Sequence, residues 1–202
     1  MTDYRKISIL AGTLYIIGFI SGLLSIVPAI DASDYLIKAS ANENQVLIGA
    51  LFQFIMTIAY LCFAITLYPI LKKFNERLAL GFLSFRIVAA ILNILGIVSL
   101  LLLLSLSQGF VKAGTPDSSY FQSIGDLLQS GRDFVNHVAM ILSLSIGGLM
   151  FYFLLYITKL IPRFISLWGL LGTVLTIFAS FLIMFHIIDI ITTIYIALNL
   201  PL

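Results

Sequence analysis

Long apolar stretches with at most one charged residue, separated by short polar segments, dominate the pattern along this chain. A helix needs about 20 apolar residues to cross a hydrocarbon core about 30 Å thick, and five stretches reach that length. None alternates apolar and polar residues as barrel strands do, and a spanning segment must satisfy its own backbone hydrogen bonds. The pattern therefore predicts five membrane-spanning helices, at residues 7–29, 46–71, 78–106, 135–158 and 164–187.

The polar segment before the predicted fourth span carries apolar residues at the helical spacing i, i+1, i+4, i+7, i+8. They follow Pro116-Asp117-Ser118, which is typical of a helix start. We therefore expect an amphipathic helix at about 118–130, lying on the surface of the bundle or of the bilayer. It either only packs its apolar stripe or serves as a binding lid. The stripe consists of Tyr120, Phe121, Ile124, Leu127 and Leu128.

Residues 189–202 give an ambiguous signal. Their uncharged part, Ile190 to Leu202, has 13 residues, fewer than the roughly 17 that a span needs. It either extends the fifth helix, lies at the membrane interface, or begins a sixth helix. Taken together, the pattern predicts one all-α domain over residues 1–202. Its expected architecture is a polytopic transmembrane helix bundle with five full spans and a partial or absent sixth.

Composition supports lipid as the surrounding solvent. Hydrophobic residues make up 61% of the chain and charged residues 10%, whereas soluble domains are about half apolar and about a quarter charged. We therefore expect membrane lipids as partners. A net charge of +2, with no basic run longer than Lys72-Lys73, argues against nucleic acid. The single cysteine, Cys62, excludes an intrachain disulfide.

The basic residues predict the orientation of the bundle. Cytoplasmic segments of membrane proteins are enriched in Lys and Arg, and most basic residues here fall on the side of the N-terminus. The N-terminus is therefore expected in the cytoplasm. The basic residues on that side are Arg5, Lys6, Lys72, Lys73, Arg77, Lys159 and Arg163, and those on the other side are Lys38, Lys112 and Arg132.

Polar residues inside the second and third predicted spans form one face on each helix. Gln53, Thr57 and Tyr60 follow the spacing i, i+4, i+7, and Arg86 and Asn93 are seven residues apart. With about 1.5 Å of rise per residue, antiparallel packing brings the two faces to matching depths. We expect them to meet as an intramembrane polar stripe. It either holds the helices together by hydrogen bonds or forms a path for a ligand or an ion.

Arg86 is the only charged residue within these two spans. An arginine near the middle of a bilayer costs about 2.5–3.5 kcal/mol on insertion scales, so such residues usually have a partner or reach water. Two arrangements are open: Arg86 pairs inside the bundle, or its side chain snorkels to the cytoplasmic surface.

Two acid–histidine pairs are expected near the outer ends of the last spans. Asp133 and His137 are four residues apart, and His186 and Asp189 are three apart. Such pairs either act as a proton relay or pH sensor, or are boundary residues that reach water. No serine or cysteine nucleophile accompanies them, and two histidines argue against a zinc site. We therefore assign no catalytic residue, no metal and no cofactor.

Several segments share a pattern with one known family: 34–43 (DYLIKASANE), 67–73 (LYPILKK), 85–87 (FRI), 151–156 (FYFLLY) and 160–163 (LIPR). The chain resembles the bacterial multi-pass membrane family catalogued as domain of unknown function 4386. Arg86, Asp133 and His137 stand at matching positions. The resemblance implies a protein of the bacterial cytoplasmic (inner) membrane, without an activity to inherit. It also implies a sixth helix beyond Leu200-Pro201, which this sequence does not include.

These observations favour a non-enzymatic, membrane-embedded binding or regulatory protein. Its expected partner is a lipid, a small hydrophobic ligand or another membrane protein. The alternative is a small transporter or channel component that uses the polar stripe, and an intramembrane enzyme ranks third.

Overall fold

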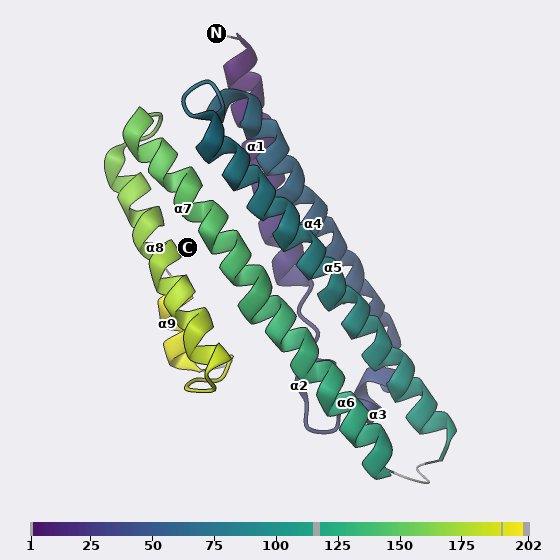
Figure 1. Cartoon of the computed structure of the whole chain (residues 1–202). Helices are drawn as coiled ribbons and strands as arrows, with labels where there is room; N and C mark the ends of the chain where they lie inside the picture. The colour runs from purple at the N-terminus through teal and green to yellow at the C-terminus, as the bar shows by residue number, and fades with distance from the viewer. Residues whose placement is uncertain (1, 115–117, 191, 200–202) are drawn as a thin grey trace.

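The fold is a bundle of antiparallel helices, with no strand among the residues that the structure describes (Figure 1). The computed structural model describes residues 2–114, 118–190 and 192–199. Five helical stretches are long and apolar enough to cross a membrane, which confirms the predicted all-α bundle and makes the chain a multi-pass membrane protein. The elements are α1 (Thr2–Leu24), α2 (Pro28–Asp31), α3 (Tyr35–Ala41), α4 (Glu43–Leu71), α5 (Glu76–Lys112), α6 (Ser118–Asp133), the π-helix η1 (Phe134–Met140), α7 (Ile141–Thr158), α8 (Arg163–Met184) and α9 (Thr193–Asn199).

The long helices pack one after another in chain order: α1 on α4, α4 on α5, α5 on α7, and α7 on α8. Short links cause this order, because helices joined by a few residues form antiparallel hairpins. Asn75 caps α5 by accepting a hydrogen bond from the Leu78 amide (3.0 Å), and Pro162 immediately precedes α8. The result is a row of five helices whose two ends are α1 and α8.

Glycines bring α1 close to α4. A Cβ added at Gly18 would lie 2.8 Å from the Tyr60 ring, and one at Gly22 would lie 3.1 Å from Met56 Sδ. Lipid tails compete for apolar contacts, so close packing of this kind is a main source of helix association in membranes. These glycines therefore serve packing within the chain.

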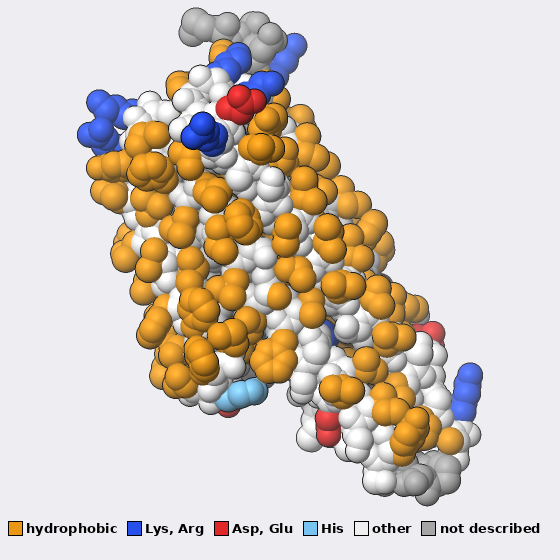
Figure 2. All heavy atoms as spheres, viewed as in Figure 1, with side chains coloured by type: hydrophobic (Ala, Val, Ile, Leu, Met, Phe, Trp, Pro, Cys, Tyr) orange, Lys and Arg blue, Asp and Glu red, His pale blue; other side chains and the backbone are white. Residues whose placement is uncertain are grey.

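Large apolar side chains cover the flank of the bundle (Figure 2). Ile91, Leu171 and Phe178, in the middle of α5 and α8, are each more than half exposed. In a bilayer this surface contacts lipid. Lys and Arg gather at the end that carries the N-terminus, where α4 and α7 end and α5 and α8 begin. We call this the N-terminal end and the opposite one the far end.

The helices α1 and α5 end elsewhere than predicted. α1 stops at Leu24 instead of residue 29, because Pro28 lacks an amide hydrogen and restricts the residue before it. Val27 accordingly has φ −124° and ψ 85°, outside the helical region. In contrast, α5 runs to Lys112 instead of residue 106, since its last turns pack on α3 and α6.

The amphipathic stretch expected at about 118–130 is helical but is not a separate surface helix. It forms α6, which continues through η1 into α7. Phe121 and Leu128 of the apolar stripe pack inward, Phe121 against Phe110 of α5 with ring centroids 5.6 Å apart, whereas Tyr120 and Leu127 are exposed. This contact favours one continuous helix from α6 through η1 to α7, because it keeps α6 alongside α5. Figure 1 shows both helices extending beyond the end of α8.

The chain turns back after α8. The helix ends at Met184, before the predicted residue 187, and His186 has a left-handed φ of 54°. The short helix α9 then packs against α8, so residues 193–199 do not extend the fifth span. With seven residues, α9 is also too short to cross a membrane.

Buried polar residues separate two apolar clusters. One cluster at the far end includes Ile30, Tyr35 and Leu100, and the other, at the N-terminal end, includes Phe63 and Phe82. Between them, buried polar side chains gather on α4, α5 and η1. These are Gln53, Thr57, Asn93 and Asn136, each less than 9% exposed.

Candidate functional site

A pocket of about 440 Å³ opens where the end of α1 meets α4, α5 and the α6–η1 helix. We call it the polar pocket, because hydrogen-bonding side chains from six elements and one loop converge on it. Four of them belong to the residues that the sequence singled out, and the others were not predicted. The first four are Gln53, Asn93, Asp133 and His137, and the others are Ser25, Asp31, Gln129, Arg132, Asn136 and Tyr195.

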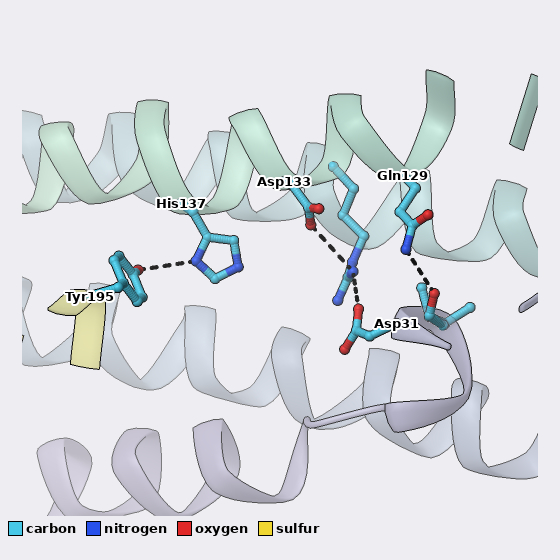
Figure 3. Close-up of polar contacts among 7 residues, drawn as sticks. Asp31, Gln129, Asp133, His137 and Tyr195 are labelled. Atoms are coloured by element: carbon cyan, nitrogen blue, oxygen red, sulfur yellow. Dashed lines mark hydrogen bonds and ion pairs between the residues drawn. The ribbon is translucent and has the colours of Figure 1, made fainter. Parts of the chain in front are cut away.

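Arg132 is the central charge of the polar pocket, and Figure 3 shows Asp31 and Asp133, the two carboxylates that pair with it. It is 8% exposed, and its Nη1 lies 3.4 Å from Asp31 Oδ1 and 3.6 Å from Asp133 Oδ1. Beside it, Gln129 Nε2 donates to the Ile30 carbonyl (3.0 Å). These contacts attach α2 to α6. They also leave the group of three charged side chains with a net negative charge.

In the described part of the chain, no hydrogen bond or ion pair joins Asp133 to His137. Asp133 faces Arg132, whereas His137 Nδ1 lies 3.2 Å from the Tyr195 hydroxyl (Figure 3). The physical reason is η1, because a π-helix closes its hydrogen bonds over five residues and side chains four apart no longer stack. The Ser180 hydroxyl of α8 donates to the His137 carbonyl in this widened turn (3.3 Å).

Tyr195 brings α9 to the polar pocket. Burial raises the pKa of its hydroxyl to about 12, so the hydroxyl keeps its proton, and can donate a hydrogen bond to His137, to a higher pH than an exposed tyrosine does. The contact thereby links the turned-back chain after α8 to η1.

His186 and Asp189 also do not pair within the described residues. The His186 ring stacks edge-on against Phe134, with centroids 5.7 Å apart. Both residues line a neighbouring pocket of about 590 Å³ that they share with Asp133. The left-handed turn at His186 separates the two side chains, which sequence spacing treats as one helical face. Among the described residues, no group of three His, Cys, Asp or Glu side chains is placed to hold a metal ion.

The two faces of the predicted stripe do meet between α4 and α5. Asn93 Nδ2 donates to Thr57 Oγ1 (2.7 Å), and Thr57 Oγ1 in turn donates to the Gln53 carbonyl (2.7 Å). Gln53 and Asn93 open onto the polar pocket. Tyr60 and Arg86 lie farther toward the N-terminal end, where the Arg86 guanidinium carbon is 5.8 Å from the Tyr60 ring centroid.

Three buried polar atoms at the pocket have no hydrogen-bond partner among the described residues: Gln53 Oε1, Asn136 Oδ1 and Arg132 Nε. An unpartnered buried polar group typically costs about 1–3 kcal/mol. Asn136 reaches its position because Gly96 faces it, and a Cβ there would clash with the amide. Side chains held in this state at one cavity are suited to binding a molecule that supplies the missing hydrogen bonds.

Three of the pocket residues that were not predicted could have been found from their spacing in the sequence. Gln129, Arg132 and Asn136 are at i, i+3 and i+7, which places them on one face of a helix. The apolar stripe of the same segment drew the prediction toward a surface helix. Asp31 and Tyr195 carried no such signal, because they come from short elements on either side of the long helices.

No curated protein and no solved structure matches the chain. The family model described as Domain of unknown function (DUF4386) matches residues 10–202, and this chain therefore belongs to that family.

Proposed function

We propose that this protein is a non-enzymatic, membrane-embedded binding protein and that the polar pocket holds its ligand. The observation that carries the proposal is the set of unpartnered buried atoms of Gln53, Asn136 and Arg132 around one cavity. A ligand that both accepts and donates hydrogen bonds would satisfy all three. The net negative charge of Arg132 with Asp31 and Asp133 disfavours an anionic ligand.

The ligand class that fits is a small amphiphile with a neutral or positively charged polar group. Apolar residues also line the polar pocket, among them Val27, Met56 and Met140, and they would contact its hydrocarbon part. Membrane lipids and small hydrophobic molecules are the corresponding partners. A helix of another membrane protein would be the alternative occupant.

The proposal includes a location in the bacterial cytoplasmic membrane with the N-terminus in the cytoplasm. The basic residues at the N-terminal end support the orientation, because cytoplasmic segments are enriched in Lys and Arg. The resemblance to bacterial family members supports the compartment. In this orientation the polar pocket belongs to the outer half of the bundle.

Native mass spectrometry of gently extracted full-length protein tests the proposal. The variant Gln53→Met/Asn136→Leu keeps side-chain volume but removes two of the unpartnered atoms. We expect a bound small molecule on the wild-type protein and at least about a tenfold lower occupancy on the variant. Gln45→Met, an exposed position on the same helix as Gln53, is the matched control and should retain the ligand. Equal occupancy in the pocket variant and the wild type would contradict the proposal.

A small transporter is the second candidate, because three cavities follow one another inside the bundle. A space of about 90 Å³ shares Asn93 with the polar pocket, and it shares Arg86 with a pocket of about 250 Å³ nearer the N-terminal end. The middle space is small and mostly apolar, which favours binding over passage. Flux of a pocket ligand into proteoliposomes, lost in Asn93→Leu, would favour the transporter.

A further inference from the structure

Arg86 lies deep inside the bundle without a carboxylate partner. It is ten residues from the start of α5, or about 15 Å along the helix axis. No Asp or Glu among the described residues forms an ion pair with it. The guanidinium carbon instead lies 5.5 Å from the ring centroid of Phe82 and 5.8 Å from those of Tyr60 and Phe63.

Aromatic rings do not satisfy the hydrogen-bond donors of a guanidinium group. The group has five N–H donors, and ring faces attract its charge but are only weak acceptors. Arg86 Nε is buried and has no hydrogen-bond partner among the described residues. An unpaired charge within a membrane helix is costly, which marks such residues as functional. Arg86 therefore lacks an anionic acceptor.

A pocket of about 250 Å³ lies beside Arg86, with hydroxyl groups from other helices around it. Thr176 of α8 is 3% exposed, and its Oγ1 has no partner among the described residues. Tyr60 and Tyr152 also line the pocket. Hydroxyl groups donate hydrogen bonds, so these side chains and Arg86 together offer donors from α4, α5, α7 and α8 to one acceptor.

The two tyrosines are held in place by glycines of the outermost helices. A Cβ at Gly18 of α1 would lie 2.8 Å from the Tyr60 ring, and one at Gly169 of α8 would clash with Tyr152. The site is thus assembled from side chains whose positions depend on close helix packing.

The pocket has a natural opening toward the bilayer. It is lined by all five long helices, but α1 and α8, the two ends of the row, are not among the helix pairs that pack extensively in the described part of the chain. Tyr15 of α1 lines the pocket and is 41% exposed. A hydrocarbon tail can therefore extend from the pocket between α1 and α8 into lipid.

We propose that this pocket, the Arg86 pocket, binds the anionic oxygen group of an amphiphile whose tail remains in the bilayer. Arg86 provides the positive charge, and Thr176 and Tyr152 provide further hydrogen bonds. A carboxylate or a phosphate fits this chemistry, whether carried by a fatty acid or by a lipid headgroup. The site is separate from the polar pocket, which lies nearer the far end and disfavours anions.

Titration of the full-length protein with oleate, followed by native mass spectrometry, tests the proposal. We expect saturable binding that is about 10- to 100-fold weaker in Arg86→Gln, as for the loss of a charged hydrogen-bond partner. Arg86→Lys should retain part of the affinity. Arg77→Gln, which removes a charge from an exposed position of the same helix, should bind as the wild type does. Equal affinity of Arg86→Gln and wild type would overturn the proposal.

Competitors distinguish the sources of the anion. Phosphatidylglycerol that displaces oleate would identify a lipid headgroup as an occupant, and failure to displace would identify the fatty acid. Both results support an amphiphile site. Oleyl alcohol binding as tightly as oleate would refute the need for an anion. Acetate or inorganic phosphate competing at the same concentration as oleate would refute the need for a tail.

Hydroxyl variants keep the proposal testable if Arg86→Gln does not fold. Thr176→Val and Tyr152→Phe retain shape and remove one donor each. We expect each to weaken oleate binding about three- to tenfold. Unchanged affinity in both would overturn the proposal.

Discussion

Two arginines lie inside this bundle, and their surroundings are opposite. Arg132 lies between two carboxylates at 3.4 and 3.6 Å and beside amide and imidazole groups. Arg86 lies among three aromatic rings, with no carboxylate paired to it in the described residues. Both side chains have an unpartnered Nε. The net charge around each arginine, more than the arginine itself, therefore determines what each pocket can bind.

The polar pocket has more negative than positive charge, and the Arg86 pocket has only a positive one. Each should therefore exclude the ligand that the other accepts. Removing a buried charge from a pair leaves its partner uncompensated, whereas removing an unpaired charge leaves nothing behind. The stabilities of the two arginine variants are consequently expected to differ.

The largest expected effect is that of Arg132→Leu. The substitution leaves Asp31 and Asp133 close together without their cation, and we expect a loss of about 2–3 kcal/mol of unfolding free energy. Arg86→Leu should change it by less than about 1 kcal/mol, because relief of the unpaired charge offsets the lost ring contacts. Denaturant titration of both variants in one detergent measures the difference. A larger loss in Arg86→Leu than in Arg132→Leu would reverse the comparison.

The double variant Arg132→Leu/Asp133→Asn tests whether charge causes the lost stability. It removes one of the two uncompensated carboxylates, so part of the lost stability should return. No recovery would mean that packing, rather than charge, accounts for the effect of Arg132→Leu.

Gly96→Ala should have the next largest effect, about 1–3 kcal/mol of destabilisation. The added Cβ clashes with Asn136 and must displace its amide from the polar pocket. Thermal unfolding in detergent gives the stability, and native mass spectrometry should show loss of the polar-pocket ligand with oleate binding retained. Gly131→Ala, whose added Cβ would meet nothing within 4 Å, is the control.

A smaller effect is expected from the hydrogen bond between Asn93 and Thr57. A double-mutant cycle with Asn93→Ala and Thr57→Ala should give a coupling of about 0.6 kcal/mol, and at most about 1.7 kcal/mol, as found for hydrogen bonds between membrane helices. Zero coupling would indicate that the α4–α5 contact depends on packing alone.

The smallest effect is expected from Tyr195→Phe, at most about 1 kcal/mol. Burial raises the pKa of Tyr195 from its ordinary value of 10.0 to about 12, so the folded state holds the phenolic proton more tightly than the unfolded chain. The stabilisation is then fully present below pH 10 and is lost as the pH rises toward 12. The difference in melting temperature between wild type and Tyr195→Phe should shrink over that range. A constant difference would show that Tyr195 contributes only through packing.

The helical hairpins could be predicted from the sequence, whereas most contacts between polar side chains could not. The meeting of the polar faces of α4 and α5 was expected from spacing and depth, because the two helices are neighbours joined by a short link. The specific hydrogen bond from Asn93 to Thr57 was not expected. The expected Asp133–His137 contact is not found in the described part of the chain, because spacing assumes an α-helix where the structure has η1. The ion pair of Arg132 could not be predicted, since its partner Asp31 is 101 residues away in the chain. The sequence indicates only that Arg132 is one of the charges used to orient the bundle.

The five apolar membrane helices and their connection as antiparallel hairpins can be predicted from the amino-acid sequence alone. Transfer into lipid is favourable segment by segment, and each segment carries that information in its own composition. The three-dimensional packing is needed to learn which polar groups share a pocket, that α6 continues into α7, and which buried arginine has no carboxylate partner among the described residues. These features depend on the rotation and depth of each helix relative to its neighbours, which side-chain packing across the interfaces sets.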